Sequence, residues 1–358
     1  MSKALLATAT LLVLAACGAG RQNVPAIGEA YVGPISLNLR SELALRAEVT
    51  ATVRHGDRLE ILEYRRRFAK VRTDKGQEGW TDGRQLLKPE QMARLRRSAE
   101  RAKHLASQGK ATPFDLLNVH TEPNRQSPSF CQIPEDGHVD LVGHRVMPRV
   151  PYTPELRNTP AAVDPSTPMD SWSLVRLVDG RAGWVLSRLI MMGIPDEVAQ
   201  YAEGHHITSY FSLGTVDDNG REKHNWLWTT IASASRLEPH QFDSFRIFVW
   251  SIRKHRYETA YIERNLKGYY PVEVQPAGAS SPMAHFSLVF AGRDGVLFKR
   301  SYQFQENKVR LIAKSPYSIP VEEADDTEAP VTEPLQKQPP ANTVVARVKN
   351  AIKGWLGR

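Results

Sequence analysis

The chain has 358 residues, of which 41% are hydrophobic and 24% charged, and its formal net charge is +8 at pH 7. Beyond one apolar run at the N-terminus, no stretch is long and apolar enough to span a bilayer, so the composition indicates roughly two or three soluble domains. The positive charge favours anionic partners such as lipid headgroups or wall polymers, because opposite charges concentrate at a charged surface.

Residues 1–16 have the features of a secretory signal peptide. Lys3 supplies a positive charge, and a largely apolar run from Ala4 to Ala16 follows, which is shorter than the about 20 residues that cross a membrane. One Leu and two Ala residues stand directly before Cys17. This arrangement resembles the lipobox of bacterial lipoprotein precursors, which implies that the Cys17 thiol takes a diacylglyceryl group and that residues 1–16 are removed.

The resemblance to lipoproteins also implies a place in the cell. The protein is expected in the cell envelope, anchored to a membrane through lipid on Cys17 and facing the periplasm. Gly18 follows the cysteine, and by analogy with enterobacterial sorting this implies the outer membrane of a diderm bacterium. Nucleic acid is not expected as a partner, because it lies in another compartment. Lipidation of Cys17 leaves Cys131 alone, so we expect no intrachain disulfide.

Two segments of the chain repeat one sequence pattern. Residues 37–42 reappear as 117–122, and the block 68–72 matches 172–176. In both copies a Gly-Trp pair follows this block at the same distance (Gly79-Trp80 and Gly183-Trp184). Alternating apolar residues between glycine turns predict short strands, and about sixty residues of such strands suit a small closed barrel.

These residues resemble the bacterial SH3-like (SH3b) domain, which opens on a Leu-Asn-Leu-Arg sequence and has a Gly-Trp pair near its end. The resemblance implies one such domain at residues 30–87 and a second at residues 114–190. The second copy departs from the pattern, because His120 stands in the place of Arg40 and a Pro-rich insertion covers residues 147–170.

A helix is predicted over residues 89–109, between the two copies. Proline stands at its first turn, glycine at its end, and apolar residues recur at helical spacing. We interpret its basic residues as a solvated face, with anion binding as the alternative. From residue 195 to about residue 320 longer strands follow, and turn sequences at 292–295 and 305–308 predict a meander within an antiparallel β domain of uncharacterised family.

The tail has two parts. Residues 321–342 combine six acidic residues with prolines, which is typical of a disordered linker. Residues 343–358 place Val348, Ile352 and Trp355 on one face of a basic amphipathic helix, which favours a membrane surface or a partner groove, with docking on the protein's own β domain as the alternative.

The predicted fold class is therefore mainly β. Two small SH3-like barrels are joined by a helix and followed by an antiparallel β domain, a disordered acidic linker and a C-terminal amphipathic helix.

No recognisable catalytic or metal-binding pattern occurs in the sequence. Cys131 stands at a strand position where the first copy has Ala51, so we interpret it as a small core residue and not as a nucleophile. The pair His205-His206 and His224 do not belong to a His-Glu-x-x-His pattern. We predict that the protein is not an enzyme and has neither metal nor cofactor; an unrecognised activity in the β domain is the alternative.

The SH3-like resemblance implies binding of cell-wall peptide or peptidoglycan. Exposed aromatic rings would supply apolar contact, and arginines would meet carboxylates. The candidate residues are Arg40, Tyr64, Phe68, Arg72 and Trp80 in the first copy, with Trp172 and Trp184 in the second. As an alternative, Trp80 and Trp184 fill the barrel cores. The alternative function is a protein-binding assembly or scaffold lipoprotein of an envelope complex.

Overall fold

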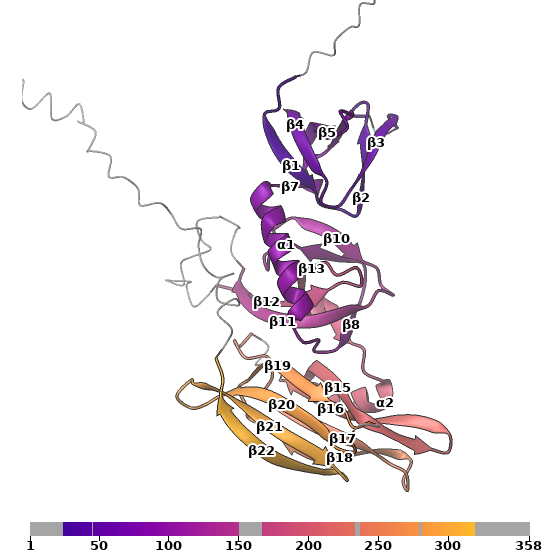
Figure 1. Cartoon of the computed structure of the whole chain (residues 1–358), viewed down its shortest axis with the longest axis vertical. Helices are drawn as coiled ribbons and strands as arrows, with labels where there is room; N and C mark the ends of the chain where they lie inside the picture. The colour runs from indigo at the N-terminus through magenta and orange to yellow at the C-terminus, as the bar shows by residue number, and fades with distance from the viewer. Residues whose placement is uncertain (1–23, 45, 150–166, 233–236, 279–280, 319–358) are drawn as a thin grey trace, which may run out of the picture. The chain divides into compact units, whose positions relative to one another are not determined.

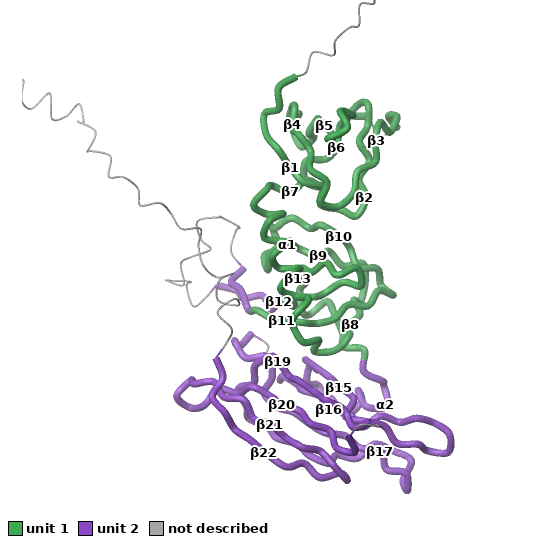
Figure 2. Tube along the Cα trace, viewed as in Figure 1, with its two compact units in different colours: residues 1–145, 172–193 green, residues 146–171, 194–358 purple. Residues whose placement is uncertain are grey.

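A computed structural model describes residues 24–44, 46–149, 167–232, 237–278 and 281–318 (Figure 1). The segment with Cys17, most of the Pro-rich insertion, the acidic linker and the C-terminal residues Val348, Ile352 and Trp355 lie outside these ranges. The described part is mainly β, with several antiparallel sheets, which confirms the predicted fold class. The chain divides into two compact units, 1–145 with 172–193 and 146–171 with 194–358 (Figure 2).

The first sheet of unit 1 has seven strands in the order β3-β2-β6-β5-β4-β1-β7. Alternate residues of these strands point inward, so that Val32, Leu39, Leu59 and Val71 share one core. The strands are β1 Gly28–Val32, β2 Ser36–Arg40, β3 Val49–Arg54, β4 Arg58–Arg65, β5 Phe68–Thr73, β6 Glu78–Asp82 and β7 Leu86–Leu87.

The second sheet of unit 1 repeats this topology strand for strand, in the order β10-β9-β13-β12-β11-β8-β14. Equivalent residues keep their partners: Arg40 lies opposite Trp80, and His120 lies opposite Trp184. The sequence repeat is therefore a structural repeat. The strands are β8 Lys110–Pro113, β9 Leu117–His120, β10 Ser129–Ile133, β11 Val139–Pro148, β12 Met169–Arg176, β13 Ala182–Leu186 and β14 Ile190–Met192.

Helix α1, Pro89–His104, connects the two sheets and ends before the predicted Gly109. Its buried residues are Met92, Leu95, Ser98 and Ala102. Part of its basic face is engaged, unlike the solvated face that we expected. Arg94 Nε lies 3.1 Å from Glu122 Oε1, and Arg96 Nη2 donates to Gly56 O over 3.3 Å. No helix among the described residues is long and apolar enough to cross a membrane.

Unit 2 contains two four-stranded antiparallel sheets, in the orders β15-β16-β17-β18 and β19-β20-β21-β22. Both sheets contribute to one core, in which Phe245 meets Phe286, Phe290 and Tyr302. The predicted meander is confirmed as β20-β21-β22. The elements are α2 Asp196–Ala199, β15 His206–Asp218, β16 Arg221–Ile231, β17 Ser244–Ser251, β18 Arg256–Glu263, β19 Gly268–Gln275, β20 Ala284–Ala291, β21 Leu297–Gln305 and β22 Lys308–Pro316.

The glycine of each Gly-Trp pair lies where two strands cross closely. A Cβ atom at Gly79 would be 2.8 Å from Leu39 Cβ, and one at Gly183 would be 2.6 Å from Val119 Cγ1. These distances are shorter than normal carbon contacts, so any side chain would push the strands apart. The repeated glycine is thus a packing requirement of both sheets.

We predict that Gly79→Ala lowers the free energy of unfolding by about 1–3 kcal/mol, because the added methyl group overpacks the core. Urea unfolding followed by circular dichroism measures this in residues 24–318, which include every described strand and both units' cores. The matched control is Gly28→Ala, where the new Cβ would be 3.8 Å from Ile61 Cδ1. Equal stability of the two variants would contradict the packing argument.

Candidate functional site

A groove of about 970 Å³ in unit 1 is the candidate site. Its volume lies in the range of about 300–1,000 Å³ that ligand sites have. One wall comes from the first sheet and the turn after β6, and the other from the end of the β9–β10 loop and from strand β10. The residues that line it include Ile35, Tyr64, Gly83, Lys88, Pro128 and Gln132.

The first wall presents apolar surface around a tight turn. Ile35 and Tyr64 are 61% and 56% exposed, although large apolar groups usually seek burial. Gly83 opens a short 3-10 turn, Gly83–Gln85, and its N–H donates to Arg67 O over 2.8 Å. A Cβ at Gly83 would be 3.0 Å from Arg67 O and 3.8 Å from Tyr64 Cε1. A side chain at Gly83 would crowd the Arg67 carbonyl, whereas Tyr64 stays exposed beside the groove.

The second wall is an edge strand. β10 pairs with β9 only, so one of its backbone edges has no neighbouring strand among the described residues. Phe130 of this strand is buried, and its ring centroid lies 5.8 Å from that of His55 in the β3–β4 turn. Burial lowers the pKa of His55. Gln132 is exposed and donates through Nε2 to Asn118 Oδ1 over 2.9 Å.

Most charges of the groove are neutralised in pairs. Arg84 Nη2 lies 2.7 Å from Asp82 Oδ2, and this hydrogen bond is the main cause that lowers the pKa of Asp82. Glu29 accepts from Arg58 Nε over 2.8 Å. Lys88 is exposed, and its ammonium group has no ion pair within the part of the chain that the structure describes. Lys88 is thus a cation available to a ligand carboxylate.

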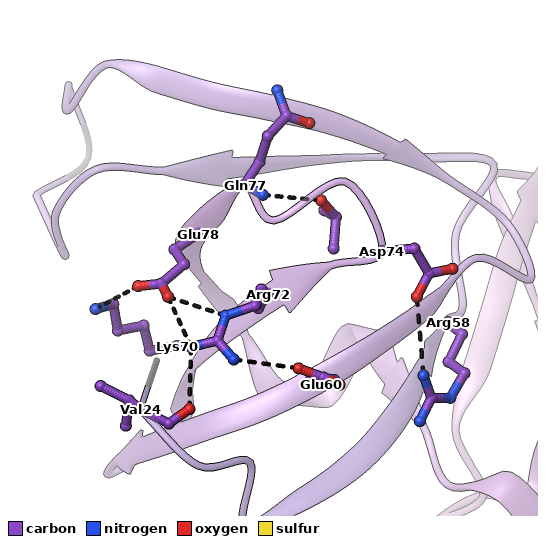
Figure 3. Close-up of polar contacts among 9 residues, drawn as sticks. Val24, Arg58, Glu60, Lys70, Arg72, Asp74, Gln77 and Glu78 are labelled. Atoms are coloured by element: carbon purple, nitrogen blue, oxygen red, sulfur yellow. Dashed lines mark hydrogen bonds and ion pairs between the residues drawn. The ribbon is translucent and has the colours of Figure 1, made fainter. Parts of the chain in front are cut away.

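Arg72, predicted to meet a ligand, is engaged by its own sheet (Figure 3). Its side chain is 11% exposed, lies 3.3 Å from Glu60 Oε2 and 2.9 Å from Glu78 Oε1, and donates to Val24 O over 3.0 Å. Lys70 also pairs with Glu78 over 3.0 Å. Hydrogen bonds from Lys70 and then Arg72 lower the pKa of Glu78. Arg72 therefore joins three strands and does not face the groove.

Of the seven binding residues predicted from the sequence, only Tyr64 lines the groove. Arg40 donates to Ala47 O over 2.8 Å, and Phe68 is half-buried beneath the guanidinium of Arg67. The three tryptophans, Trp80, Trp172 and Trp184, are at most 8% exposed, so they pack in the sheets and cannot present open ring faces. Sequence reasoning did not select Ile35, Gly83, Lys88 or Pro128; the Asp-Gly turn signal at Gly83 was the available clue.

The second copy differs from the first at the position of Arg40. His120 Nδ1 lies 2.9 Å from Ser127 O, and its ring meets Trp172 edge-on with the centroids 5.5 Å apart. Burial lowers the pKa of His120. The imidazole thus belongs to the packing of the second sheet, as the guanidinium of Arg40 belongs to the first.

Cys131 lies opposite Val119, just as Ala51 lies opposite Leu39. The thiol is free and buried, and burial raises its pKa to about 12. Among the described residues, no group of three His, Cys, Asp or Glu side chains is placed to hold a metal ion.

Family comparison covers part of unit 1. Residues 35–86 match the family model of the bacterial SH3 domain. The bacterial SH3 domain thus accounts for β2 to β7 in the first sheet, including Tyr64 and Gly83 of the groove. No curated protein matches the chain.

Solved structures similar to the chain include an NlpC/P60 family protein from Bacillus cereus. It is 11% identical with a TM-score of 0.21, over 83% of this chain and 97% of that one. NlpC2 and NlpC1 from Trichomonas vaginalis are also similar, each with 11% identity and a TM-score of 0.16. Each match covers 81% of this chain, and it covers 96% of the NlpC2 chain and 92% of the NlpC1 chain.

The prediction that the protein is not an enzyme does not stand beside these similar structures, which are of NlpC/P60 proteins. That prediction excluded every enzymatic activity, and it was wrong. At TM-scores this low, the similarity assigns neither an activity nor active-site residues to this chain.

We predict that Cys131 of residues 24–318 resists alkylation by iodoacetamide. At about pH 8, a pKa of about 12 leaves roughly a thousandfold less thiolate than the ordinary value of 9.0, and the thiolate is the reactive form. Mass spectrometry after timed labelling measures the rate, with protein in urea as the control in which the thiol is open. Equal rates in the folded and unfolded protein would contradict a buried, protonated thiol.

Proposed function

We propose that the groove binds an extended peptide of the bacterial cell wall. The observation that supports this best is the position of the exposed Tyr64 and Ile35 within a groove whose first wall belongs to the match with the bacterial SH3 domain. Domains of this family commonly bind peptidoglycan, so the site and the family point to the same class of ligand. By its repeated strand order, the second sheet is proposed to be a second SH3-like domain.

The chemistry of the walls suits such a peptide. The ring of Tyr64 and the side chain of Ile35 give apolar contact at a low cost in side-chain entropy. Lys88 can pair with a free carboxylate, which wall peptides possess. The open edge of β10 offers backbone N–H and C=O groups to an extended chain, as in strand addition. Each wall thus recognises a different feature of the ligand.

We predict that Tyr64→Ala weakens the binding of residues 24–318 to insoluble peptidoglycan about tenfold, because truncating an aromatic contact residue removes about 1–2 kcal/mol of binding energy. Co-sedimentation over a range of peptidoglycan amounts measures this. The matched control is Phe114→Ala, since Phe114 is an aromatic residue of unit 1 that is 57% exposed and lies outside the groove.

Two results would oppose the proposal. If the unaltered protein stays in solution, the wall is not its ligand, and the assembly or scaffold function becomes the better interpretation. If both variants lose binding equally, the ligand does not occupy the groove. Circular dichroism of each variant shows whether the fold is retained.

We also propose that the protein is anchored to a membrane of the bacterial envelope, the outer membrane of a diderm, by lipid on Cys17. The support is the sequence alone: a positive residue, a short apolar run and Leu-Ala-Ala before the cysteine. Two or three acyl chains on one residue give stable attachment, because each buried methylene contributes about 0.8 kcal/mol.

We predict that Cys17→Ser abolishes incorporation of labelled palmitate in a bacterial host and moves the protein from the detergent phase to the aqueous phase of a Triton X-114 separation. The reason is that serine cannot accept the thioether-linked lipid. Cys131→Ser is the matched control and should keep the label. Labelling that persists in the Cys17→Ser variant would contradict the proposed anchor.

A further inference from the structure

The turn between β17 and β18 in unit 2 combines an exposed apolar residue with several cations. It consists of Ile252, Arg253, Lys254 and His255, and Arg256 begins the next strand. All five residues are exposed, and Ile252 is 55% exposed although a side chain of this kind is usually buried.

The cations of this turn outnumber their carboxylates. Lys254 Nζ and Arg256 Nη2 share one oxygen, Glu258 Oε1, at 2.5 and 3.7 Å. Arg253 has no ion pair within the described part of the chain. Three cations against two carboxylates, Glu258 and the Asp218 that His255 contacts, leave an excess of positive charge around Ile252.

Unit 2 holds the turn in this shape. His255 has a positive φ of 47°, and its Nδ1 lies 2.8 Å from Asp218 Oδ2 at the end of β15. Trp250 Nε1 donates to the same oxygen over 2.9 Å. Asp218 is itself buried, so the β17–β18 turn is fixed to the neighbouring hairpin. These contacts hold the turn in a conformation that leaves the Ile252 side chain exposed.

Two other hairpin turns of the chain lack this combination. The β12–β13 turn exposes Val178, but its charges Asp179 and Arg181 pair with each other at 2.7 Å. The β20–β21 turn, residues 292–296, exposes Val296, but its one arginine, Arg293, is balanced by one aspartate, Asp294. An exposed apolar residue and excess positive charge occur together in the β17–β18 turn and in neither of these.

We propose that the β17–β18 turn docks on an anionic membrane surface. Ile252 enters the boundary between headgroups and acyl chains, while Arg253, Lys254 and Arg256 meet the lipid phosphates. A soluble polyanion would satisfy the cations equally well, but it offers no apolar interior for Ile252. The apolar residue at the centre of the cations therefore favours lipid.

Co-sedimentation of residues 24–318 with vesicles tests this. Vesicles of phosphatidylcholine with phosphatidylglycerol should bind the protein, and vesicles of phosphatidylcholine alone should bind it much less. Ile252→Ser should lower the partition coefficient about tenfold, and Arg253→Gln about fivefold. Val178→Ser is the matched control for an exposed apolar turn residue and Arg293→Gln for an exposed arginine in a turn, and both should bind as the parent does.

Two results would overturn the proposal. Equal binding to both kinds of vesicle would exclude recognition of anionic lipid. An unchanged partition of Ile252→Ser, together with loss of binding in Arg253→Gln and competition by soluble polyphosphate, would assign the turn to polyanions instead of membranes. Tyr64→Ala should leave vesicle binding unchanged, which separates this proposal from that of the groove.

Discussion

The attachment of helix α1 to both sheets of unit 1 is the constraint on which the groove depends. Because the two walls of the groove come from different sheets, its width is set by whatever fixes those sheets together. Arg176 of β12 donates to Ala102 O and Leu105 O over 2.7 and 3.1 Å, using carbonyls that a helix end leaves without partners. At the other sheet, Arg96 stacks on Tyr31 of β1 with 5.4 Å to the ring centroid. The helix thus contacts both sheets and fixes the spacing between the two walls of the groove.

Fixed walls matter for binding because ordering flexible groups opposes association. Gly83 and its turn hold one wall, and the β9–β10 pairing holds the other, so a peptide would meet surfaces that are already formed. The acids near the groove are paired with arginines, and this leaves the ammonium of Lys88 to act on a ligand carboxylate without a competing charge beside it. Recognition then rests on shape and apolar contact, with one cation for orientation.

The ion pairs around Arg72 show how a residue's role depends on its neighbours in space. Glu60, Arg72 and Glu78 come from β4, β5 and β6, which are adjacent in the first sheet, so their side chains lie across from each other. Removing one partner of these partly buried pairs is costly, because it reduces the compensation of the charge that stays. An arginine that looked free in the sequence therefore stabilises the sheet. Surface charge in a repeat cannot be assigned to a ligand before its cross-strand neighbours are known.

Features that depend on near neighbours along the chain could be predicted from the amino-acid sequence. Alternating residues such as Leu37 and Leu39 specify strands with one buried face, Pro89 starts the helix, and the repeated Gly-Trp pairs mark one topology used twice. Features that join distant segments depend on the way the whole chain folds. It buried Trp172 and Trp184, since a ring on a strand faces the core or the solvent depending on how the whole sheet closes. It also brought Tyr64 toward Pro128–Gln132, some sixty residues later in the chain. A local sequence pattern indicates which face of a strand is apolar, whereas a binding groove forms only where residues from different sheets lie next to each other.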